Sequence, residues 1–184
     1  MMVAGVLDPR RLLFVDECGT HTSLAPVYGY APRGERLRLS LPRNRGKNTT
    51  LLASMSLEGM GPSLAVEGST TAEVFEAYLE RVLLPELEEG QVVVMDSLPA
   101  HKPARVRELI EGRGCELLYL PGYSPDYNPI EEAFSKIKEI VRRARARTRE
   151  ALVEALGEAL SAVSLRDAWG FFEHAGYHPT GQLL

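Results

Sequence analysis

A short apolar run that ends in an acid constrains the fold more than any other feature of this sequence. Residues 91–96 are Gln-Val-Val-Val-Met-Asp. A continuous valine-rich run of this length is typical of a strand buried on both faces of a parallel sheet. Open α/β sheets bind their ligands at the carboxyl ends of such strands. The pattern therefore places Asp96 at the ligand-binding edge of an α/β sheet.

A second run near the amino terminus has the same pattern. Residues 12–15 are apolar, and Asp16 and Glu17 follow them. If the two strands are adjacent and parallel, Asp16 and Asp96 meet at one edge, and strand alternation turns Glu17 to the opposite face. The structural alternative for either aspartate is an acid that ends a strand and caps the next turn.

A third acid follows an ordered turn. Residues 121–129 contain three prolines and one glycine. We expect a helix to begin at Pro129, with Asn128 as its N-cap. Glu131 falls in the first turn. Its structural alternative is a capping box with Asn128, because the spacing fits that motif. The helix itself is predicted by apolar residues at helical spacing, namely Ile130, Phe134, Ile137, Val141 and Ala144.

These features together resemble the DDE transposases of the mariner superfamily and its bacterial insertion-sequence relatives. Residues 124–131 are Ser-Pro-Asp-Tyr-Asn-Pro-Ile-Glu, and 34 residues separate Asp96 from Glu131. The resemblance implies that Asp16, Asp96 and Glu131 form a catalytic, metal-binding triad. One departure is Ser97, where the family usually has Asn. It affects a contact behind the triad and leaves the triad itself unchanged.

The order of the expected elements is that of a ribonuclease-H-like fold, an α/β architecture with a mixed five-stranded sheet flanked by helices. We expect one catalytic domain over residues 1–184, with a loop and hairpin insertion at 18–47 and a helical extension at 148–184. The expected elements are a strand ending at Asp16, a hairpin over 49–66, a helix opened by Thr70–Glu73, the strand ending at Asp96, a helix after Pro103, a strand over 115–120, and the helix from Pro129.

Charge is distributed unevenly along the chain. The net charge is −4, but residues 32–47 and 136–149 are strongly basic, whereas residues 67–90 hold seven glutamates and one arginine. Basic segments on either side of an acidic site suit a polyanion that passes a metal centre. The alternative is a solvated helix face. The candidate DNA-binding residues are Arg33, Arg36, Arg43, Arg45, Lys47, His101, Lys102, Lys138, Arg142 and Arg145.

The remaining sequence features indicate a protein that is not secreted or membrane-spanning and whose cysteines stay reduced. Cys18 and Cys115 have no paired spacing, and the amino terminus lacks a signal-peptide pattern. No segment has the roughly 20 apolar residues that span a bilayer. We therefore expect a cytoplasmic protein. The Cys18–His21 pair has zinc-like spacing but lacks a second ligand pair.

The resemblance implies a metal-dependent reaction on DNA. Oxygen-only ligands favour Mg²⁺ or Mn²⁺, and two ions are expected. The implied activity hydrolyses phosphodiester bonds at the ends of an element and joins the freed 3′-hydroxyl to target DNA, by family analogy at TA. The expected partners are double-stranded DNA, a second copy of the chain on that DNA, and a separately encoded amino-terminal half.

Three other functions remain open on the sequence alone. The first is another ribonuclease-H-like nuclease, such as a junction resolvase. The second is a phosphoacceptor receiver domain, which the predicted hairpin and the Asn-Pro-Ile-Glu turn disfavour. The third is a non-catalytic remnant that binds DNA or a transposase partner. Relatives carry a helix-turn-helix module ahead of the catalytic domain. Its absence here predicts a split gene or a truncated copy.

Overall fold

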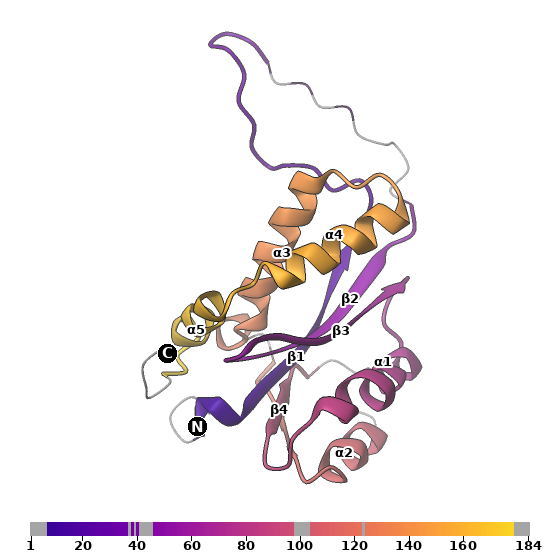
Figure 1. The fold of residues 1–184 in the computed structure, drawn as a ribbon, viewed down its shortest axis with the longest axis vertical. Helices are drawn as coiled ribbons and strands as arrows, with labels where there is room; N and C mark the ends of the chain where they lie inside the picture. Colours follow the sequence, from indigo (N-terminus) through magenta and orange to yellow (C-terminus); the bar gives the residue numbers. More distant parts are fainter. Residues whose placement is uncertain are drawn as a thin grey trace.

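The core of the structure is a mixed five-stranded sheet (Figure 1). The computed structural model describes residues 7–36, 38, 40, 46–97, 104–122 and 124–178. In spatial order the strands are β3, β2, β1, β4 and β5. Their bounds are β1 (Leu12–Thr20), β2 (Thr49–Ser56), β3 (Gly59–Glu67), β4 (Val92–Met95) and β5 (Glu116–Tyr119).

Strand β1 lies at the centre and pairs in both directions. It runs antiparallel to β2 and parallel to β4, and β5 continues the parallel half. The parallel register of β1 and β4 ends at the pair Val15–Met95. Asp16 and Asp96 are the next residues on the two strands, so the prediction of two adjacent aspartate-bearing strands is confirmed. The element order and directions are those of the ribonuclease-H-like fold.

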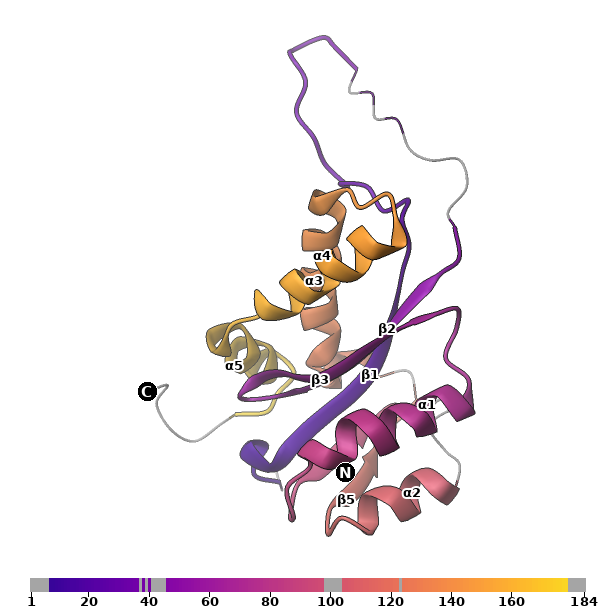
Figure 2. The same ribbon diagram turned by 45° about the vertical axis from the view of Figure 1, so that its right-hand side comes forward.

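Helices cover both faces of the sheet (Figures 1 and 2). Helices α1 (Ala72–Tyr78) and α2 (Ala104–Glu111) pack on one face, and α3 (Ile130–Ala144), α4 (Arg149–Ser161) and α5 (Leu165–His174) pack on the other. Successive side chains of β1 point to opposite faces of the sheet, so β1 contributes to the hydrophobic core on each face. Phe14 belongs to the core under α3–α5, and Val15 belongs to the core under α1 and α2. Asp16 shares the face of Phe14, which is the face that α3 covers.

Hydroxyl side chains cap three of the helices. Thr71 caps α1 by accepting a bond from the Val74 N–H at 3.3 Å, so the cap is one residue after the predicted Thr70. Thr148 caps α4, and Ser164 opens α5 in a capping box with Asp167. Helix α1 continues as a π-helical turn over 79–83 and ends at a 3-10 turn that contains Pro85.

The connection between β1 and β2 projects from the body of the molecule (Figure 1). Strand β1 continues to Thr20, beyond its predicted end, and the described residues 21–36 form turns and irregular structure. The predicted hairpin from Pro26 to Leu39 is therefore not formed across this described part. The physical reason is a lack of packing, because an isolated two-stranded hairpin is marginal in water. Tyr28 and Tyr30 are 90% and 101% exposed.

Two further sequence-based expectations concern the cysteines and membrane-spanning segments. Cys18 and Cys115 are both free thiols and both buried. Across the described ranges, no helix combines the length and apolarity needed to cross a membrane.

Candidate active site

The three predicted acids line one cavity at the carboxyl edge of the parallel strands. The cavity has a volume of about 380 Å³, and its walls include Asp16, Asp96 and Glu131. Asp16 comes from β1, Asp96 follows β4, and Glu131 lies in the first turn of α3. The turn between β5 and α3 closes one side through Leu120, Pro121, Gly122, Ser124, Pro125 and Asn128. Three elements that are far apart in sequence thus converge at the edge where the fold places ligands.

Asp16 is the buried member of this group, with 5% of its surface exposed. Its Oδ1 accepts a bond from the Glu17 N–H at 2.7 Å, and its Oδ2 accepts one from Asn128 Nδ2 at 2.7 Å. An ionised carboxylate has no proton to donate, so the amide nitrogen of Asn128 must face it. Hydrogen bonds to the charged form compensate for the loss of water around a buried carboxylate.

Asn128 does not cap α3, which corrects the sequence-based prediction. The residue before the helix is Pro129, and α3 begins at Ile130 with no side-chain cap. The Asn128 side chain turns instead to the buried Asp16 carboxylate. A charge-assisted bond in the interior is stronger than a bond to a solvated helix terminus, which explains the choice. Glu131 is exposed, and the capping box considered as its structural alternative is not formed.

Ser97 contacts the neighbouring strand behind Asp96. Its Oγ donates to the Leu120 carbonyl at 2.9 Å, and the Leu120 N–H donates to the Met95 carbonyl at 2.9 Å. The ends of β4 and β5 are therefore joined on both sides of Asp96. Ser97 therefore contacts the backbone that follows β5.

Cys18 lies within electrostatic reach of two of the acids and of Lys138. Burial raises the pKa of the Cys18 thiol to about 12, Asp16 and Glu131 raise that pKa as well, and Lys138 opposes them. Cys18 follows Asp16 on the same face of β1, and Lys138 lies two helical turns after Glu131 on α3. The thiol is therefore protonated at neutral pH.

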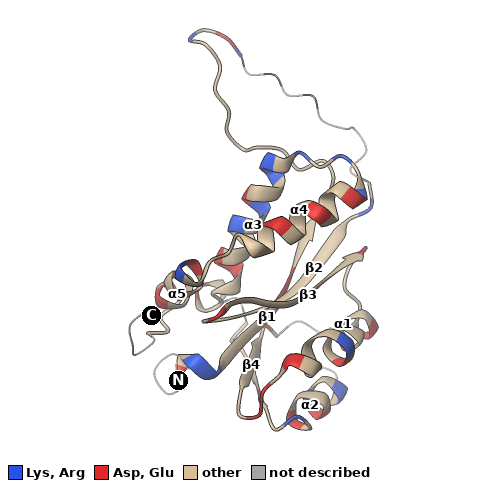
Figure 3. Ribbon diagram, in the orientation of Figure 1, with Lys and Arg blue, Asp and Glu red and all other residues tan. Residues whose placement is uncertain are grey.

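The other predicted DNA-binding residues lie in three places. Arg33 and Arg36 are exposed on the projecting loop. Lys47, at the end of that loop, pairs with Glu67 at 2.5 Å. Arg142 lies in the last turn of α3 and Arg145 is its C-cap residue. Lysine and arginine gather along this helix (Figure 3). Arg43, Arg45, His101 and Lys102 lie outside the described residues.

Sequence reasoning missed two further contacts. Tyr177 donates its hydroxyl to the Tyr127 carbonyl at 2.9 Å, next to Asn128. Arg147 donates to the carbonyls of Thr22 and Leu24 at 2.9 and 3.3 Å and holds the base of the projecting loop. Neither contact has a local signal, because each joins residues that are at least 50 positions apart.

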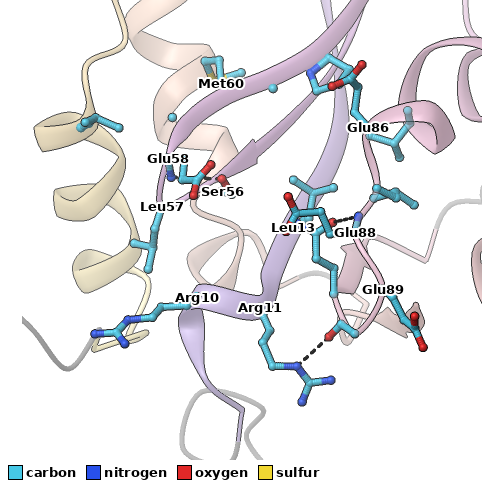
Figure 4. A pocket seen from close by; sticks show the side chains of 18 of the residues that line it. Arg10, Arg11, Leu13, Ser56, Leu57, Glu58, Met60, Glu86, Glu88 and Glu89 are labelled. Carbon is cyan, nitrogen blue, oxygen red and sulfur yellow. Dashed lines mark hydrogen bonds between the residues drawn. The ribbon is translucent and has the colours of Figure 1, made fainter. Parts of the chain in front are cut away.

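A larger cavity of about 900 Å³ lies at the opposite, amino-terminal edge of the sheet (Figure 4). It is bordered by the β2–β3 turn, the residues before β4 and the start of α5. Arg11 closes part of it by donating to the Gly90 carbonyl at 2.7 Å. Among the residues that the structure describes, none of the predicted catalytic or DNA-binding ones lines this cavity. The acidic cavity at the carboxyl edge is therefore the candidate active site.

The donor set of the acidic cavity suits a hard divalent cation. Three carboxylates supply only oxygen ligands, which Mg²⁺ and Mn²⁺ prefer. Over the part of the chain that the structure describes, no three His, Cys, Asp or Glu side chains lie close enough together to hold a metal ion. Negative charges that share a site repel one another, so a tighter cluster of these three requires a cation among them.

Comparison with known proteins agrees with the fold. A family described as DDE superfamily endonuclease matches residues 11–153, and the chain belongs to this family. The Transposable element Tcb1 transposase of Caenorhabditis briggsae is 28% identical over 108 residues, which cover 56% of this chain and 40% of that protein.

Solved structures of the Mos1 transposase share the fold. The paired-end complex with the left transposon end has a TM-score of 0.74 at 21% identity, and covers 91% of this chain and 52% of that one. The Mos1 catalytic domain with raltegravir and Mg has a TM-score of 0.68 at 19% identity, and covers 91% of this chain and 79% of that one. The chain thus spans about 40% of the Tcb1 transposase and about half of the longer Mos1 chain.

Proposed function

We propose that this chain is the catalytic domain of a DDE transposase. It would hydrolyse phosphodiester bonds at the ends of a DNA element and join the freed 3′-hydroxyl to target DNA. The observation that carries the proposal is the convergence of Asp16, Asp96 and Glu131 on one cavity. The family match and the transposase relatives support the same activity.

The three carboxylates are proposed to hold Mg²⁺ or Mn²⁺, with two ions as in other enzymes that displace phosphoryl groups. The oxygen-only donor set supports this choice, and one Mos1 structure contains Mg. Bound ions would supply Lewis-acid stabilisation of phosphoryl oxygens and a more acidic water.

The chain's own residues would hold and orient the DNA backbone. Lys138 lies on α3 within electrostatic reach of Cys18, and Arg142 and Arg145 follow it one and two turns later. Lysine and arginine gather along α3 (Figure 3). Arg33 and Arg36 on the projecting loop would add contacts farther along the same DNA. Such contacts bind phosphates without reading sequence. We therefore propose that recognition of the element ends needs a separate module, and that two copies act together on DNA.

The proposal is tested by Asp96→Asn, which keeps the shape of the side chain and removes its charge. The assay measures nicking of supercoiled plasmid in Mn²⁺ and joining of a fluorescent 3′-hydroxyl oligonucleotide to that plasmid. The wild type should do both, and Asp96→Asn should do neither while it retains DNA as well as the wild type.

Asp126→Asn is the matched control, because Asp126 belongs to the same turn and does not line the cavity. It should keep both activities. Nicking by Asp96→Asn within a few-fold of the wild type would contradict the assignment. Nicking without joining would indicate a ribonuclease-H-like nuclease instead of a transposase.

A further inference from the structure

The contact between Asn128 and Asp16 joins two buried polar side chains that are 112 positions apart. Asn128 is 6% exposed and Asp16 is 5% exposed. Buried polar groups are costly unless they are hydrogen-bonded, so this 2.7 Å bond is a structural requirement for both residues. It also fixes which way the carboxylate of Asp16 faces.

We propose that Asn128 is a positioning residue that holds the Asp16 carboxylate in its metal-binding orientation. This inference rests on the proposed function, since it assigns a role towards the metal. The Glu17 N–H and the Asn128 amide occupy one site on each oxygen of Asp16, and each carboxylate oxygen has a second lone pair. These two bonds restrict the rotation of the Asp16 carboxylate. A neutral donor also offsets the repulsion that Asp16 meets from the other two acids.

Tyr177 extends this arrangement to the C-terminal segment, defined here as residues 165–178. Its hydroxyl donates to the Tyr127 carbonyl at 2.9 Å, one residue before Asn128. Burial raises the pKa of Tyr177 to about 12, so the hydroxyl is protonated and donates at any working pH. Its ring meets that of Phe14 with centroids 5.2 Å apart, two residues before Asp16. Tyr177 thus contacts both chain segments that the Asn128–Asp16 bond connects.

The C-terminal segment is itself attached to α3. Lys136 bonds Asp167 at 2.6 Å, and His174 bonds Glu132 at 3.0 Å. The rings of Phe172 and Phe14 pack edge to face at 5.3 Å. These contacts fix the C-terminal segment, and with it Tyr177, against α3 and β1. Tyr177 accordingly acts as a second positioning residue, which supports the turn that carries Asn128.

The test measures Mn²⁺ affinity directly, by titration with detection of free Mn²⁺ by electron paramagnetic resonance. Asn128→Ala should bind Mn²⁺ about 10–100-fold more weakly than the wild type, as is typical when a residue that orients a metal ligand is lost. Asn128→Ser, whose hydroxyl is too short for the same contact, should show a similar loss and replaces the alanine variant if that one does not fold. Thr50→Val is the control, because it also removes a buried hydroxyl bond, at 2.5 Å to the Gly68 carbonyl.

Tyr177→Phe and Tyr78→Phe form a matched pair. Each removes one tyrosine hydroxyl that donates to a backbone carbonyl, at 2.9 Å to Tyr127 and at 2.8 Å to Pro62. Tyr78 belongs to the core on the other face of the sheet. Both variants should lose similar stability in urea. Tyr177→Phe alone should also bind Mn²⁺ about 2–10-fold more weakly, which is the range of one net hydrogen bond.

The outcomes separate this inference from the proposed function. If the wild type binds no Mn²⁺, the proposed function fails. If the wild type binds Mn²⁺ and a folded Asn128 variant binds it within two-fold of the wild type, the positioning role of Asn128 is overturned and the proposed function stands. Equal Mn²⁺ affinity in Tyr177→Phe and Tyr78→Phe would overturn the role of Tyr177.

Discussion

Replacement of Glu131 by Gln tests whether Glu131 is a metal ligand or only a residue at the start of a helix. The two roles predict different changes in stability when Mn²⁺ is added. Glu131 is exposed, and no side-chain cap is present at the start of α3. In the absence of metal, the variant loses the favourable interaction of its charge with the helix dipole, about 0.3–1 kcal/mol. Relief of repulsion from Asp16 and Asp96 acts in the opposite direction. The metal-free stability should therefore change by less than about 1 kcal/mol.

The response to metal should change much more. Mn²⁺ at ten times its dissociation constant stabilises the wild type by about 1.4 kcal/mol. For a domain of this size, that free energy raises the melting temperature by about 3–5 °C. If Glu131 is a ligand, the rise should shrink or disappear in Glu131→Gln at the same Mn²⁺ concentration. Differential scanning fluorimetry over a Mn²⁺ series measures it.

Glu132→Gln is the control for this experiment. Glu132 lies in the same first turn and loses the same charge, but it bonds His174 at 3.0 Å and does not line the cavity. Glutamine keeps a side-chain oxygen for the bond to His174, so Glu132→Gln should keep the full Mn²⁺ response. A full-sized rise in Glu131→Gln would refute the ligand role of Glu131.

Three further predictions concern DNA binding, pH and packing. Binding of duplex DNA of arbitrary sequence should weaken at least about 100-fold between 50 and 200 mM salt, measured by fluorescence anisotropy; tight, salt-insensitive binding to one sequence would contradict the need for a separate recognition module. Hydrogen bonds from Lys136 and Ser164 lower the pKa of Asp167 from 3.8 to about 2. Since the folded-state pKa is the lower one, this stabilisation is present above about pH 4 and is lost as the pH falls towards 2. Asp167→Asn should thus cost about 1 kcal/mol at pH 7 and progressively less below pH 4 in urea titrations, after allowance for partial exposure; a cost that is constant with pH would refute the ionic origin. Phe172→Ala should cost about 3–5 kcal/mol, because its ring is fully buried against Phe14, and a loss below about 1 kcal/mol in urea would show that this core repacks.

Local patterns were sufficient to predict the sheet and the place of the acids. The apolar runs that end at Asp16 and Asp96 specify buried strands, and two buried strands of one sheet are most simply parallel neighbours. The pairing of Val15 with Met95 confirms this arrangement. Helical spacing after Pro129 likewise predicted α3. In each case, the physical cause lies within a few residues of its effect. The ligand roles of the three acids remain predictions.

The side-chain contacts were less predictable because their causes are not local. Asn128 has the properties of an N-cap, yet a buried carboxylate on β1 attracts its amide more strongly than the helix terminus does. The projecting loop has residues compatible with a hairpin, but nothing in the described structure packs on Tyr28 and Tyr30. Tyr177 carries no motif of its own. Its role follows only from the folded position of the C-terminal segment.

The long sequence separation of the Asn128–Asp16 bond has a consequence for the time at which the site forms. A ribosome releases β1 early, and 112 positions pass before Asn128 appears. Another 50 positions separate Tyr127 from the tyrosine that supports it. Contacts between distant residues form late because loop closure must precede them. A growing chain that already contains Asp16, Asp96 and Glu131 therefore still lacks Tyr177, which supports the turn that carries Asn128. If Asn128 and Tyr177 have the positioning roles proposed above, the acidic cavity becomes fully ordered only after residue 177 has been synthesised.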